Sequence, residues 1–136
     1  MDMSFQDGLG VLDVGDPTDP VEVGVWHSPT GRAHYAQPTP DGDVTFVGDE
    51  IFSEPYGGVH VLDTSDLSSI ERLAVIEPPE SGGIPTAHNF DVSANRLEVA
   101  WNSGCVIQFD ITDPAERPER PSISVRVGGR PRIEPS

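Results

Sequence analysis

The chain has 136 residues, of which 23 are acidic and 8 basic, and its formal net charge is −15. A surface this negative repels the phosphates of nucleic acids and of anionic lipid headgroups, so neither is expected as a partner. The single cysteine excludes an intramolecular disulfide, and no apolar run approaches the roughly 18 residues of a membrane-spanning helix.

Short apolar or alternating runs, bounded by Pro, Gly, Asp or Ser, follow one another from residue 8 to residue 127 and predict strands. Residues 1–7 show no such pattern and are expected to form a flexible lead-in, and residues 128–136 a flexible tail. No segment has helical periodicity of useful length, so the sequence predicts an all-β fold. The expected strands are 9–14, 21–26, 33–37, 44–47, 57–63, 68–76, 87–92, 97–101, 104–111 and 121–127.

Three of these strands carry the same unit, an apolar pentapeptide that ends in Asp, with a second Asp three residues later. The unit is LGVLD at 9–13, VHVLD at 59–63 and VIQFD at 106–110, so its first Asp recurs after 50 and 47 residues. A period of this length is typical of stacked units such as propeller blades. The strands group into repeat units near 8–26, 33–77 and 87–127. We therefore expect a partial β-propeller with about two and a half four-stranded blades.

The repeated pentapeptide, its trailing Asp and the His88-Asn89 pair resemble the LVIVD-repeat family. The resemblance extends over residues 8–127 and implies β-propellers, mostly at bacterial and archaeal cell surfaces, whose biochemical role is largely unassigned. A cell-surface location is thus an expectation from the family alone, because no signal peptide is recognised at Met1. All eight basic residues are arginine, and excess acid without lysine favours a halophilic proteome, in which salt screens the self-repulsion.

The repeat places two carboxylates at the end of each unit. Such groups are Ca²⁺ ligands in other proteins, but the Gly and distal Glu of known Ca²⁺ loops are absent here. An Asp at a strand end also accepts backbone N–H bonds and fixes the following turn, and recurrence once per blade favours that structural role. The structural turn candidates are Asp13, Asp16, Asp63, Asp66, Asp110 and Asp113.

Two histidines begin equivalent strands of the last two units. His34 matches His88 at a separation of 54 residues, whereas Val44 matches Leu97 at 53, so one inserted or deleted residue is expected in the intervening turn. Because inner strands line the axis of a propeller, these imidazoles are weak candidates for binding a divalent metal, with further ligands from other blades or from His27. The alternative is that each histidine packs at a strand end and binds a neighbouring blade by a hydrogen bond; no other cofactor is expected.

No catalytic constellation is present: the sequence has neither a Gly-x-Ser-x-Gly elbow nor a phosphate-binding loop. We therefore expect a non-catalytic module that binds a protein or small ligand through loops on one propeller face, with residues 51–57 as the best contact loop. The alternatives are a metal-dependent enzyme that uses His34 and His88, and a truncated fragment without independent function. A second copy, or blades of a longer chain, would complete the propeller.

Overall fold

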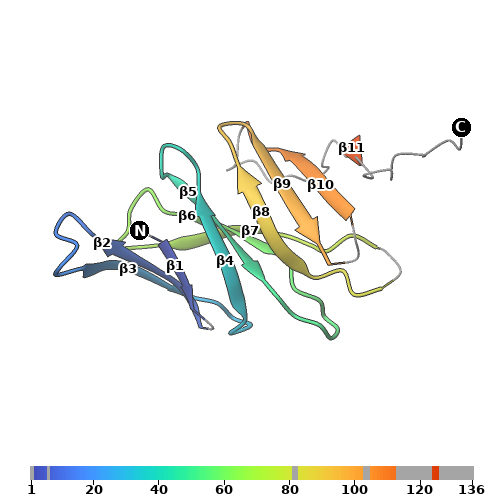
Figure 1. Ribbon diagram of the computed structural model, residues 1–136, viewed down its shortest axis with the longest axis horizontal. Helices are drawn as coiled ribbons and strands as arrows, with labels where there is room; N and C mark the ends of the chain where they lie inside the picture. Colours follow the sequence, from blue (N-terminus) through green and yellow to red (C-terminus); the bar gives the residue numbers. More distant parts are fainter. Residues whose placement is uncertain (1, 6, 81–82, 103–104, 113–123, 126–136) are drawn as a thin grey trace, which may run out of the picture.

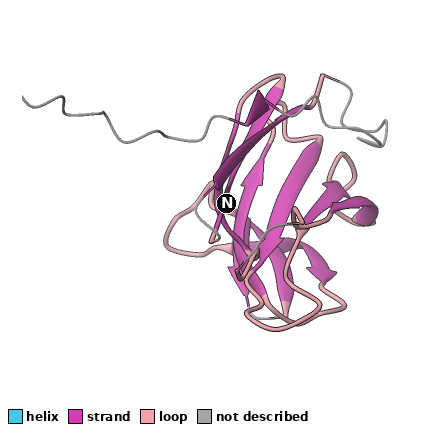
Figure 2. Ribbon diagram, turned by 90° about the vertical axis from the view of Figure 1, so that its right-hand side faces the viewer, coloured by secondary structure: helices cyan, strands magenta, loops and turns pink. Residues whose placement is uncertain are grey.

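The computed structural model describes residues 2–5, 7–80, 83–102, 105–112 and 124–125. These residues form strands β1 to β11 and no helix, which confirms the all-β prediction (Figure 1, Figure 2). Within this part of the chain there is accordingly no helix of the length and hydropathy needed to cross a bilayer. The strands form three antiparallel sheets, and in each sheet strands that follow one another in sequence are paired.

The first sheet begins earlier than the sequence predicts. It contains β1 (Asp2–Phe5), β2 (Gly8–Asp13) and β3 (Val21–His27). The expectation of a flexible lead-in over residues 1–7 is wrong for residues 2–5, which pair with β2 from Asp2 opposite Val11 to Phe5 opposite Gly8. Four residues are too few for a clear sequence periodicity, and the ladder to β2 supplies their backbone hydrogen bonds.

The other two sheets each have four strands. The second contains β4 (Ala33–Pro38), β5 (Val44–Asp49), β6 (Val59–Asp63) and β7 (Glu71–Ile76). The third contains β8 (Ala87–Val92), β9 (Arg96–Trp101), β10 (Cys105–Asp110) and β11 (Ser124–Val125). Of the strand expected at 121–127 only β11 lies in the described residues, and the tail expected at 128–136 lies outside them.

The central strands β5 and β6 of the second sheet are buried on both faces. Since successive side chains of a strand point to opposite sides, the two faces pack into different cores. Phe46 and Val61 belong to the core shared with the third sheet, whereas Val47 and Leu62 belong to the core shared with the first sheet. All six residues of β5 are buried. The first strands lie side by side: Figure 1 shows β4 between β1 and β8, and β4 packs against both.

The turn between the first two strands is two residues shorter in the third sheet than in the second. The Thr39 N–H donates to the Val44 carbonyl, and in the third sheet the Ser93 N–H donates to the Arg96 carbonyl. Ser93 follows Thr39 by 54 residues, whereas Arg96 follows Val44 by only 52. The expected separation of 53 for this strand is therefore wrong by one residue. Since a shift of one residue exchanges the two faces of a strand, the partner of Leu97 in the repeat is Thr45, not Val44.

Candidate functional site

The repeat carboxylates that the structure describes cap tight turns after their strands. Each accepts a backbone N–H from the residue two positions later: Asp13 from Gly15, Asp16 from Thr18, Asp63 from Ser65, Asp66 from Ser68 and Asp110 from Thr112. In the last four turns the Ser or Thr hydroxyl donates to the same oxygen. Asp113, the sixth candidate, lies outside the described residues.

These hydrogen bonds favour the ionised carboxylate. The Ser65 hydroxyl, followed by the Ser65 N–H, holds the pKa of Asp63 below its ordinary value of 3.8. The pKa of Asp16, Asp66 and Asp110 is lowered in the same way by the hydroxyl and N–H of their own turns. A carboxyl whose pKa is lower in the folded state stabilises the fold above its unfolded pKa, and this contribution disappears as the pH falls through the folded value.

We expect Asp63→Ala to lower the melting temperature at pH 7 by a few degrees, because the turn after β6 loses its acceptor. Asp19→Ala is the control, since it removes one exposed acid from the turn after β2 and corrects for the relief of charge repulsion. The difference between the two variants should shrink below pH 4, as Asp63 becomes protonated in the folded wild type. Thermal unfolding followed by circular dichroism measures it; a pH-independent difference would contradict the role of the carboxylate.

The histidines predicted from the repeat meet in space, together with an acid that the sequence did not single out. The rings of His34 and His88 lie with their centroids 5.1 Å apart. Glu50 reaches both: its Oε2 is 3.3 Å from His34 Nδ1 and its Oε1 is 3.8 Å from His88 Nε2. One ligand atom from each of these side chains lies within 4.8 Å of the other two. We call His34, Glu50 and His88 the His–Glu–His cluster.

Each histidine of this cluster is the extra residue of a β-bulge. Ala33 and Tyr35 pair with consecutive residues of β5, which leaves His34 without an opposite partner in the ladder. His88 has the same place between Ala87 and Asn89, opposite β9. A bulge turns its residue away from the regular alternation of the strand. The two repeats therefore use one backbone irregularity, at one position, to bring both imidazoles together.

Glu50 is fixed by its neighbours, because buried Thr86 anchors the backbone on either side of it. The Thr86 hydroxyl donates to the Asp49 carbonyl at 3.2 Å and accepts the Ile51 N–H at 2.8 Å. The Glu50 N–H itself donates to the Arg32 carbonyl at 3.2 Å. Thr86 directly precedes β8, so the strand that carries His88 also holds the backbone of Glu50.

The residue equivalent to Glu50 in the third sheet is Asn102. The Asn102 N–H donates to the carbonyl of Thr86, just as Glu50 donates to that of Arg32 in the second sheet. The Asn102 side-chain amide lies 3.5 Å from Glu50 Oε1, at the limit of a hydrogen bond. Two repeats thus contribute a histidine and a polar side chain each, and the four side chains converge between β4 and β8.

The loop expected to make contacts adjoins this cluster. Residues 51–53 form, with Arg32 and Glu50, a surface hollow of about 270 Å³. Phe52 is 58% exposed on its rim. At the far end of the loop Gly57 accepts the Ala87 N–H at 3.0 Å, and any larger residue there would overlap the Asp49 carbonyl. The loop and the histidines, predicted separately, therefore share Glu50 and form one surface.

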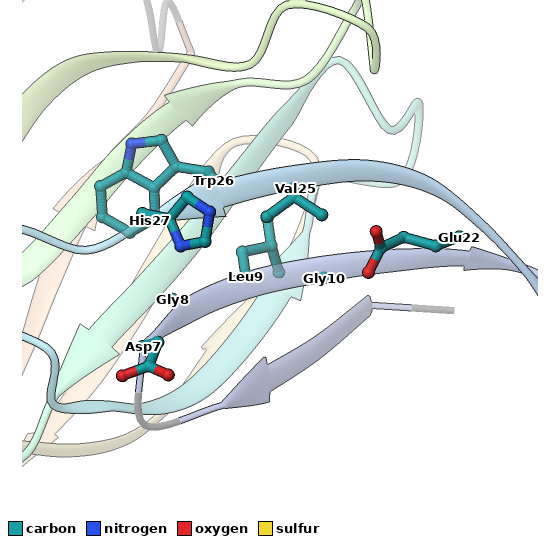
Figure 3. A pocket seen from close by; sticks show the side chains of 8 residues that line it. All are labelled: Asp7, Gly8, Leu9, Gly10, Glu22, Val25, Trp26 and His27. Atoms are coloured by element: carbon teal, nitrogen blue, oxygen red, sulfur yellow. The ribbon is translucent and has the colours of Figure 1, made fainter.

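The structure does not bring His27 into this site. His27 ends β3 and lines a separate hollow of about 210 Å³ with Asp7, Glu22 and Trp26, which Figure 3 shows over β2 and β3. In the described part of the chain the His–Glu–His cluster is the group of three potential ligands that lies close enough to hold a metal, and His27 does not belong to it.

His60 is buried between the first two sheets rather than at the candidate site. Its Nε2 lies 2.7 Å from Asp49 Oδ2, and the Thr30 hydroxyl donates to the same oxygen at 2.6 Å. The indole of Trp26 packs against the imidazole with the ring centroids 5.1 Å apart. Only about 3% of His60 and 1% of Asp49 is exposed, so this pair supports the fold and is closed to ligands.

No protein-family model and no curated protein sequence matches this chain.

Proposed function

We propose that the chain is a β-propeller module of the LVIVD type that binds a protein or small-ligand partner without catalysis. The architecture is supported by the sheet order, by the packing of β1, β4 and β8 side by side, and by bulges that recur at equivalent places. The second of these bulge pairs lies opposite the repeated unit. Val23 of β3 is the extra residue between the partners of Val11 and Leu12, and Leu73 of β7 is the extra residue between the partners of Val61 and Leu62. A repeat that stacks on its neighbours through both faces is the arrangement of propeller blades.

The binding surface comprises the His–Glu–His cluster, Asn102 and the loop 51–57, and we call it the cluster face. The observation that carries the proposal is the hollow beside Glu50, in which an exposed phenyl ring, a guanidinium and a carboxylate lie together. Exposed aromatic and arginine side chains next to a hollow are typical of contact surfaces. The short segments that form this hollow are anchored by Thr86 and Gly57, so little ordering would be needed on binding.

Affinity capture from the source lysate, carried out with wild type and matched variants, tests this proposal. We expect Phe52→Ala and Arg32→Ala to reduce recovery of a specific partner at least tenfold, because both side chains line the hollow. Val106→Ala is the control, since Val106 is 45% exposed on β10 of the third sheet, away from the hollow. Recovery that is the same for all variants would contradict the use of this face.

A further inference from the structure

We propose that the His–Glu–His cluster binds a divalent transition metal ion of the Zn²⁺ class through His34, Glu50 and His88. This inference rests on the proposed function in one respect: it places the ion on the cluster face, where the partner is proposed to bind. Two imidazoles and one carboxylate are a ligand set that such ions accept, whereas Ca²⁺ and Mg²⁺ prefer oxygen ligands alone.

One of the separations between the ligand atoms already matches that of a tetrahedral site. Metal–ligand bonds of 2.0–2.1 Å place neighbouring ligand atoms about 3.3 Å apart. His34 Nδ1 and Glu50 Oε2 already lie at 3.3 Å, and all three ligand atoms lie within 4.8 Å of one another. The His34 and His88 side chains are 39% and 44% exposed, so small rotations of the rings would complete the set.

The backbone holds the three ligand side chains close together without a bound ion. Both histidines leave their strands at bulges, and Thr86 fixes the segment that carries Glu50. Asn102 approaches Glu50 Oε1 and orients the carboxylate, as residues that hydrogen-bond to metal ligands do elsewhere. Among the described residues, the cluster also differs from the other exposed acids in that three potential ligand atoms lie within 4.8 Å of one another.

Three protein ligands leave at least one coordination position open towards solvent. The open position could take water or a donor atom of the partner, which is the arrangement found in metal sites that exchange ligands. The strongly negative chain raises the local concentration of cations at such a site. The ion would thus join β4 to β8, and with them the second sheet to the third.

Isothermal titration of chelator-treated, tag-free protein with ZnCl₂ tests the proposal, and Co²⁺ absorption in the visible range reports the coordination. We expect one Zn²⁺ per chain, with affinity at least tenfold weaker in His34→Ala, His88→Ala and Glu50→Gln. His27→Ala, which removes a histidine outside the cluster, should bind as the wild type does. CaCl₂ in excess should leave the Zn²⁺ isotherm unchanged, and lower pH should weaken binding because protons compete for the imidazoles.

Absence of Zn²⁺ binding would overturn the proposal. Equal binding by the wild type and all ligand variants would also overturn it and would mean an adventitious ion only. Each ligand variant removes an exposed or half-buried side chain, and its thermal unfolding without metal shows whether it remains folded. Partner capture, carried out with and without chelator, distinguishes failure of the metal site from failure of the proposed binding surface. If Phe52→Ala loses the partner, the binding surface is supported whether or not the chain binds Zn²⁺.

Discussion

Phe46→Ala is expected to lower the free energy of unfolding by about 3–5 kcal/mol. Phe46 is 1% exposed and belongs to the core between the second and third sheets. Its removal loses apolar contacts and leaves a cavity between two sheets whose backbones are fixed by their own ladders. A domain of this size has about 5–15 kcal/mol of stability in total, so the variant would retain only part of it.

Urea unfolding followed by tryptophan fluorescence measures this loss. Urea is preferable to guanidinium chloride, which would also screen the net charge of −15. Phe52→Ala is the matched control, because the same atoms are removed from a ring that is 58% exposed, and it should change stability by less than about 0.5 kcal/mol. Equal losses in the two variants would mean that the core between these sheets does not stabilise the fold.

Asp49→Ala is expected to lower the free energy of unfolding by about 2–4 kcal/mol. Asp49 Oδ2 lies 2.7 Å from His60 Nε2 and accepts the Thr30 hydroxyl. Truncation leaves the buried His60 Nε2 without its partner, whereas Thr30 is exposed and also bonds Ser28. His60 is buried against Trp26 and cannot turn to water without opening the interface between the first two sheets. The penalty is therefore that of one buried polar group, His60, left without its partner.

Asp49→Asn keeps the volume of the side chain and replaces only one carboxylate oxygen by an amide. Asparagine keeps one oxygen acceptor in place, and we expect it to lose less than half as much stability as alanine. Asp43→Ala, which removes an exposed acid from the turn between β4 and β5, serves as the control and should change stability little. An Asp49→Ala variant as stable as Asp43→Ala would contradict the structural role of the pair.

The sequence was sufficient to predict most strands, because each is a short apolar run that ends in turn-forming residues. It did not reveal β1, since pairing with β2 is a tertiary effect and four residues carry little pattern. It also placed the second strand of the third sheet one residue out of register. The cause is the turn after β8, whose length can be read only from the hydrogen bond between Ser93 and Arg96.

That error of one residue also concealed part of the candidate site. A repeat separation of 53 residues pairs Glu50 with Ser103, whereas the separation of 52 in the structure pairs it with Asn102. Glu50 and Asn102 each directly follow the second strand of their sheet and lie beside a histidine. The approach of His34 to His88 could be predicted because both begin equivalent strands. The third member of the cluster, Glu50, could not be predicted, because it is one of 23 acids in the sequence. The bulges that direct the histidines towards Glu50 also have no signature in the amino-acid sequence.

The second sheet shares one core with the first sheet and another with the third. Its central strands β5 and β6 are therefore protected by both interfaces, whereas an outer sheet depends on one. Local opening at either end of the stack leaves β5 and β6 covered on their other face, so their amide hydrogens should exchange with solvent only when both interfaces separate. In a nearest-neighbour description of repeat proteins, the middle unit carries both coupling free energies, and its exchange rate reports the cooperativity of the whole array.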